Sequence, residues 1–70
     1  MKTKVIAKIK NQEQEWEEPF VLGGKHSKDE MYNSIKNLLE LYNTHLRPHD
    51  TPRELIEIKS LEIIPETLNF

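Results

Sequence analysis

Glycine, lysine and histidine follow one another at one point of the chain, in an order that suggests an anion site. The stretch Leu22-Gly23-Gly24-Lys25-His26-Ser27 joins a glycine turn and a lysine to the expected start of a helix, and helix N-termini attract anions. A phosphate-binding P-loop, however, places Ser or Thr directly after its lysine. Here His26 intervenes, and Asp29 and Glu30 already supply negative charge to the helix start. We therefore favour a plain turn between a strand and a helix.

Three histidines raise the question of a bound metal ion. His45 and His49 are separated by three residues, Asp50 is adjacent to the second, and His26 is a distant third candidate. Pro48 ends the expected helix between the two histidines, so their spacing does not place them on one helix face. The sequence has no cysteine, and no second ligand pair completes a tetrahedral set. We expect no metal and no other cofactor.

A nucleophile beside a base, or two carboxylates in a closed cleft, would indicate an enzyme. Ser27 is expected to cap a helix, Ser34 falls among polar residues, and Ser60 has no histidine near it in the sequence. The glutamates between Glu13 and Glu18 indicate a solvated face, and a chain this small rarely encloses an active site. We expect that the protein is not an enzyme, and we identify no small-molecule substrate.

The length and composition indicate one small domain over residues 1–70. A chain of 70 residues buries only about 60% of the surface that its unfolded form exposes, so its core is marginal. Disulfides are excluded because the chain has no cysteine, which leaves oligomerisation or a larger partner as the source of extra stability. The absence of cysteine also fits a reducing compartment.

The net charge of −2 provides no overall attraction to phosphate backbones. Nucleic acid is therefore disfavoured as a partner. No apolar run approaches the roughly 20 residues of a membrane span, and Val5-Ile6-Ala7 is too short for the core of a signal peptide. We expect a cytoplasmic protein without a membrane partner.

The stretch from Ser27 to Leu46 predicts the helix that organises the fold. Ser27 and Glu30 have the spacing of a capping box, in which each side chain binds the backbone N–H of the other residue. An apolar stripe follows at steps of four and three residues, consisting of Met31, Ile35, Leu38, Tyr42 and Leu46. Pro48 stops the helix.

Two segments before the helix predict a hairpin. Lys2 to Lys10 alternates in the period of a half-buried strand, and Glu15 to Leu22 sets Trp16, Phe20 and Leu22 on one face. Polar residues 11–14 separate the two segments. Because Pro19 cannot donate a ladder hydrogen bond, the second segment is either an edge strand or a bulged one.

The run from Glu54 to Ile64 predicts a third strand, with Ile56 and Ile58 on one face and a bulge or bend at Ser60. Residues 51–54 also spell a helix start with proline at its first position, so Pro52 to Ile64 is open between a strand and an element that begins as a helix. Leu68 and Phe70 in the tail after Pro65 are expected to dock on the domain or on a neighbour.

Together these segments predict an α+β fold in the order β-β-α-β. We expect a three-stranded, mostly antiparallel sheet with one helix packed on one face. The order of the strands in the sheet remains open.

Apolar residues beyond those that the core requires give the main indication of function. Leu39 and Leu41 fall on either side of the predicted stripe, Tyr32 is the spare aromatic residue of the helix, and Phe20 lies on the expected edge strand. Exposed apolar flanks on a small domain without cross-links indicate protein contact. We predict a protein-binding module that forms a homodimer or docks on a larger protein as an accessory or inhibitory module. The alternative is a nucleic-acid-binding module that uses the basic residues Lys2, Lys4, Lys8 and Lys10.

The segment from Tyr42-Asn43 through Leu46-Arg47-Pro48 to Arg53-Glu54-Leu55-Ile56 resembles stretches in short uncharacterised bacterial and phage reading frames. The resemblance implies a small stand-alone protein, encoded by a bacterium, a phage or a prophage. It implies no activity.

Overall fold

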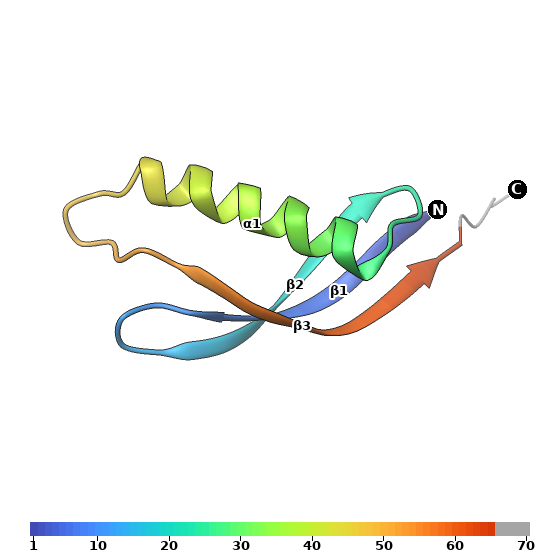
Figure 1. Cartoon of the computed structure of the whole chain (residues 1–70), viewed down its shortest axis with the longest axis horizontal. Coiled ribbons are helices and arrows are strands. Elements are labelled where there is room, and N and C mark those ends of the chain that lie inside the picture. The colour runs from blue at the N-terminus through green and yellow to red at the C-terminus, as the bar shows by residue number, and fades with distance from the viewer. Residues whose placement is uncertain (66–70) are drawn as a thin grey trace, which may run out of the picture.

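The computed structural model describes residues 1–65, and within them it contains three strands and one helix. These are β1 (Lys2–Lys10), β2 (Glu15–Gly23), α1 (Lys28–Thr44) and β3 (Glu54–Ile64). The strands form one antiparallel sheet in the order β2-β1-β3, and α1 lies across one face of it (Figure 1). The predicted β-β-α-β fold is confirmed. The structure also decides the strand order, because β1 is central and both other strands are edges.

The β1–β2 hairpin turns at Asn11, whose side chain organises the polar residues of the loop. Its Oδ1 accepts hydrogen bonds from the N–H groups of Glu13 and Gln14 at 2.8 and 2.7 Å. The register then runs without a shift and sets Pro19 opposite Ile6. In a strand pair without a register shift, each N–H that points toward the neighbouring strand is needed for pairing. The N–H that Pro19 lacks would therefore point outward, to the free edge of β2. Of the two readings of Pro19, the edge strand is therefore correct.

β3 is a strand from its first residue, so the alternative that this segment begins as a helix is wrong. Its pairing with β1 shifts twice, and the shifts leave Ile56 and Lys59 without a partner in the register. The bulge expected at Ser60 therefore lies one residue earlier, and a second bulge was not predicted. Because Ile56 is the extra residue of that second bulge, Leu55 and Ile58 are both buried. The prediction that Ile56 and Ile58 lie on the same face of the strand is wrong.

The core lies between α1 and the covered face of the sheet. It consists of Val5, Ala7, Ile9, Met31, Ile35, Leu39, Leu55 and Ile58. Trp16, Phe20 and Leu22 of β2 pack partly buried against it, as predicted.

The helix stripe differs from the predicted one at two positions, because Leu46 lies beyond the end of α1 at Thr44 and Leu39 replaces Leu38. Leu39 is buried with 5% exposure, whereas Leu38, which was assigned to the stripe, is 52% exposed. The backbone of α1 approaches β3 more closely than β2. Successive residues are separated by about 100° around a helix, so this tilt toward β3 exchanges the roles of the two leucines.

No helix within residues 1–65 combines the length and the apolar character that crossing a membrane requires. The tail residues Leu68 and Phe70 lie outside the described part of the chain, so the prediction that they dock remains untested.

Candidate functional site

One helix does not cover the full width of the sheet, and a groove remains between α1 and β2. We call this hollow of about 330 Å³ the α1–β2 groove. Its lining is mostly apolar and consists of Glu18, Phe20, Leu38, Leu39, Leu41, Tyr42, His45 and Arg53. Phe20 enters the groove from β2 and is half-buried. Leu39 lines it from the buried face of α1.

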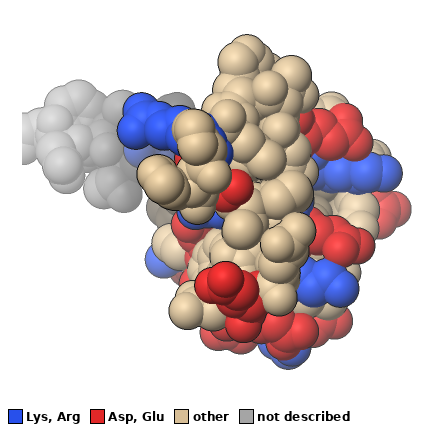
Figure 2. Space-filling view, turned by 90° about the vertical axis from the view of Figure 1, so that its left-hand side faces the viewer, with Lys and Arg blue, Asp and Glu red and all other residues tan. Residues whose placement is uncertain are grey.

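Leucines of α1 form the exposed wall of this groove. Leu38 is 52% exposed and Leu41 is 59% exposed. With Ser34 and His45 they recur at steps of four, three and four residues, which places them on one flank of the helix. Figure 2 shows the end of the molecule at which α1 stops, where uncharged surface covers the top. An uncharged flank with two exposed leucines is unusual for a helix that faces only water.

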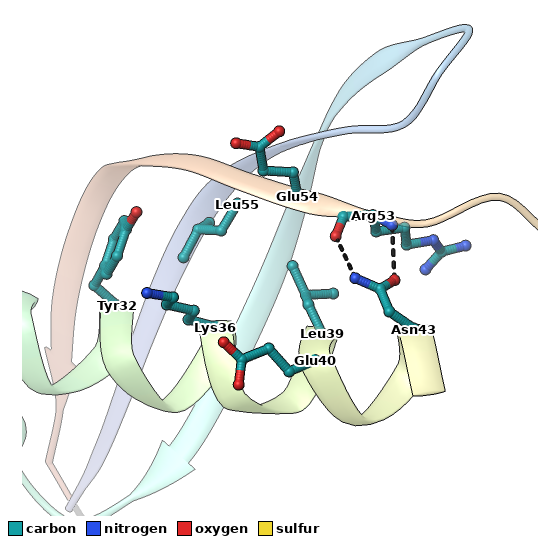
Figure 3. A pocket seen from close by; sticks show the side chains of 8 residues that line it. All are labelled: Tyr32, Lys36, Leu39, Glu40, Asn43, Arg53, Glu54 and Leu55. Atoms are coloured by element: carbon teal, nitrogen blue, oxygen red, sulfur yellow. Dashed lines mark hydrogen bonds between the residues drawn. The ribbon is translucent and has the colours of Figure 1, made fainter. Parts of the chain in front are cut away.

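Arg53 closes the end of the α1–β2 groove, and sequence reasoning did not identify it. Its guanidinium carbon lies 4.5 Å from the centre of the Tyr42 ring and 5.2 Å from that of Trp16. The side chain of Asn43 holds the backbone of Arg53, since its Nδ2 donates to the Arg53 carbonyl at 2.9 Å and its Oδ1 accepts from the Arg53 N–H at 2.8 Å (Figure 3). Trp16, Tyr42 and Arg53 are far apart in the sequence, so no local sequence pattern predicts this cluster.

A second hollow, of about 310 Å³, lies on the other flank of α1, toward β3 (Figure 3). It is lined by Tyr32, Lys36, Leu39, Glu40, Asn43, Arg53, Glu54 and Leu55. Charged side chains from both elements surround it, and the half-buried ring of Tyr32 packs against the core. This flank has the character of an ordinary solvated helix side.

The four residues predicted to bind a partner do not form one surface. Phe20 and Leu41 meet in the α1–β2 groove, whereas Tyr32 lies on the opposite flank of the helix. The expectation that Leu39 is an exposed flank is wrong, because the tilt of α1 toward β3 buries it in the core. Leu38 takes its place on the exposed side.

The backbone polar groups of the glycine turn form hydrogen bonds within the protein. Gly24 has a positive φ of 87°, a conformation that glycine adopts without strain. The buried hydroxyl of Thr3 donates to the Gly24 carbonyl at 2.8 Å and accepts from the N–H of His26 at 2.9 Å. The N–H groups of Gly24 and Ser27 are also engaged, with the Met1 carbonyl and with Glu30. An anion would have to compete for these donors.

The predicted capping box at the start of α1 is confirmed. Ser27 and Glu30 exchange two hydrogen bonds of 3.1 Å each. Next to it, Nε2 of His26 donates to the Gly23 carbonyl at 2.7 Å, and Nδ1 lies 3.4 Å from the Glu30 carboxylate. The Gly23 carbonyl and then Glu30 raise the pKa of His26 above 6.5. The Ser27 N–H and then His26 lower the pKa of Glu30 below 4.5.

The histidines lie at opposite ends of α1. His45 is the C-cap residue, and its Nδ1 lies 3.0 Å from the Leu41 carbonyl, whereas His26 precedes the first turn. A helix of 17 residues separates them by roughly 25 Å. In the described part of the chain, no three histidines or carboxylates gather as a metal site would require.

The lysines of β1 lie on the sheet face that α1 leaves open, and glutamates flank two of them on both sides. Lys8 lies between Glu17 and Glu57 in the register, and Lys10 lies between Glu15 and Glu54. Ion pairs join Lys8 to Glu15 at 3.4 Å and Lys10 to Glu54 at 3.6 Å. These carboxylates weaken the attraction of the lysines for phosphate.

Comparisons of this chain with protein-family models, with curated proteins and with solved structures return no match.

Proposed function

We propose that this chain is a non-enzymatic protein-binding module that docks its partner in the α1–β2 groove. The observation that supports the proposal is the exposure of Leu38 and Leu41 beside the half-buried Phe20. Contiguous apolar surface of this kind marks interaction sites on small proteins. A partner that covers these side chains would add apolar burial to a domain whose own core is small.

The groove is a better docking site than the edges of the sheet. Pro19 interrupts the donors at the outer edge of β2, and the bulges at Ile56 and Lys59 distort the outer edge of β3. A partner strand would find no unbroken row of hydrogen-bonding groups on either edge. Docking of an amphipathic helix against the groove, by its apolar face, avoids this difficulty.

The physiological setting belongs to the same proposal. We propose an accessory or inhibitory role in the cytoplasm of a bacterium, with the gene in the host genome, a phage or a prophage. Nucleic-acid binding through β1 is the less favoured alternative, because glutamates flank Lys8 and Lys10 on both sides.

Site-specific photo-crosslinking in the native cell tests the proposal. Benzoylphenylalanine at position 41 keeps an apolar side chain in the groove, and the same group at position 33 replaces Asn33, an exposed polar residue of α1. We expect protein adducts from position 41 that are absent from position 33. Identical adducts from both positions, or none from position 41, would contradict the proposal.

A further inference from the structure

Arg53 presents a guanidinium group that lies beside two aromatic rings and forms no ion pair within residues 1–65. Its guanidinium carbon lies 4.5 Å from the Tyr42 ring centre, and Asn43 fixes its backbone with two hydrogen bonds. The ion pairs recorded among the described residues involve Lys8, Lys10, His26 and Lys59, and none involves Arg53. The hydrogen bonds of Arg53 use its backbone, so the donors of its side chain face water.

The surroundings of the guanidinium limit what it can bind. Its carbon lies over the Tyr42 and Trp16 rings, and its side-chain N–H groups form no hydrogen bond within residues 1–65, so the edge of the group is available to an acceptor. A carboxylate is the group that matches this edge, because its two oxygens accept two parallel hydrogen bonds. Glu18 lines the same groove but forms no ion pair with Arg53. Within residues 1–65 no carboxylate pairs with Arg53, so the guanidinium is open to a carboxylate of another molecule.

The same groove offers apolar contacts next to this charge. Phe20, Leu38 and Leu41 line it together with Arg53. Tryptophan, tyrosine and arginine contribute most to binding in protein interfaces, especially where they cluster. Trp16, Tyr42 and Arg53 form such a cluster at the end of the apolar wall.

We infer that the occupant of the α1–β2 groove is an amphipathic segment of a partner protein that carries a carboxylate beside leucine-class side chains. The carboxylate pairs with the guanidinium of Arg53, and the apolar side chains pack on Leu38, Leu41 and Phe20. This inference rests on the proposed function, and it adds the chemistry of the partner. The negative charge of Glu18, which lines the same groove, disfavours a second acidic group of the partner beside it.

A library of random 16-residue peptides displayed on phage serves as the probe. It is selected in parallel on wild type, Arg53→Gln, Leu41→Asp and Arg47→Gln. Arg47 is an exposed arginine of the loop after α1, so its substitution removes the same charge without altering the groove. Bound peptides are then titrated by the fluorescence of Trp16, the only tryptophan of the chain, which lies beside Arg53.

We expect wild type and Arg47→Gln to select peptides enriched in leucine-class residues and in Asp or Glu. Arg53→Gln should lose the acidic enrichment, and peptides selected on wild type should bind it about tenfold more weakly. Arg53→Lys keeps the charge without the planar fork and should fall between the two. Replacing the glutamate of a selected peptide by glutamine should weaken its binding to wild type equally, and this measurement leaves the fold of the protein untouched.

The outcomes separate this inference from the proposed function. If Leu41→Asp abolishes selection but Arg53→Gln keeps the acidic enrichment, the groove is a docking site and the carboxylate inference is wrong. If neither substitution changes the selected peptides, the proposed docking site fails as well. A wild-type dimer in light scattering that Leu41→Asp dissociates would identify a second copy as the occupant, which would also overturn the carboxylate-bearing partner.

Discussion

The guanidinium carbon of Arg53 lies 4.5 Å from the centre of the Tyr42 ring, and the next residue of the helix, Asn43, binds both the backbone N–H and the carbonyl of Arg53. Two consecutive residues of α1 thus fix the residue that directly precedes β3. The amide of Asn43 supplies the donor and the acceptor that a neighbouring strand would supply, which holds Arg53 extended. This contact joins the end of the helix to the sheet and closes one end of the α1–β2 groove.

Asn43→Ala should lower the free energy of unfolding by about 1–3 kcal/mol, because it removes two partly buried hydrogen bonds. Asn37→Ala is the matched control, since Asn37 is an exposed asparagine of the same helix and gains the same helix propensity on substitution. Urea denaturation of both variants measures the difference. Equal stabilities would show that the contact between Asn43 and Arg53 does not hold β3 in place.

Leu39→Ala and Leu38→Ala should differ strongly although the two residues are adjacent. Leu39 is 5% exposed, so its truncation should cost about 2–5 kcal/mol. Leu38 is 52% exposed, so its truncation should change stability by less than about 1 kcal/mol. Thermal unfolding followed by circular dichroism compares the variants. A larger loss for Leu38→Ala would mean that the helix packs with the face that the sequence pattern predicted.

His26→Gln should destabilise the protein in a limited pH range. The raised pKa of His26 means that its stabilisation is complete below the ordinary value of 6.5 and is lost as the pH rises through the folded-state pKa above it. The lowered pKa of Glu30 means that its stabilisation is present above the ordinary value of 4.5 and is lost as the pH falls through the folded-state pKa below it. The difference in melting temperature from wild type should therefore be largest between these two values.

The matched control for this measurement is His49→Gln, which removes an exposed histidine of the loop. Its melting temperature should follow that of wild type across the same pH series. If His26→Gln shows a constant difference at every pH, the ion pair with Glu30 contributes nothing and only the hydrogen bond to the Gly23 carbonyl matters. The effect is expected to be small, because Glu30 faces solvent.

Local patterns predicted the elements of this fold, although they left Pro52 to Ile64 open between a strand and an element that begins as a helix. The capping box at Ser27 and Glu30, the alternation in Lys2 to Lys10 and the proline at position 19 each depend on neighbours within a few residues. Their geometry is set by backbone sterics and hydrogen bonding, which act locally. For that reason the bounds of β1 and β3 match the prediction residue for residue.

The site depended on contacts that no local pattern encodes. Whether Leu38 or Leu39 is buried follows from the tilt of α1 toward β3, and both choices satisfy a helical apolar period. Likewise the alternation of residues in β3 did not predict the bulge at Ile56, because this bulge arises from the pairing of β3 with β1.

The sequence by itself determined the order of the elements and the start of the helix, because short-range sterics and capping act on adjacent residues. Only the tertiary structure decided that β2 is an edge strand, which leucines line the α1–β2 groove and that the guanidinium of Arg53 lies over the Tyr42 and Trp16 rings. Arg53 directly precedes β3, Tyr42 lies near the end of α1 and Trp16 lies near the start of β2, and packing alone brings them together.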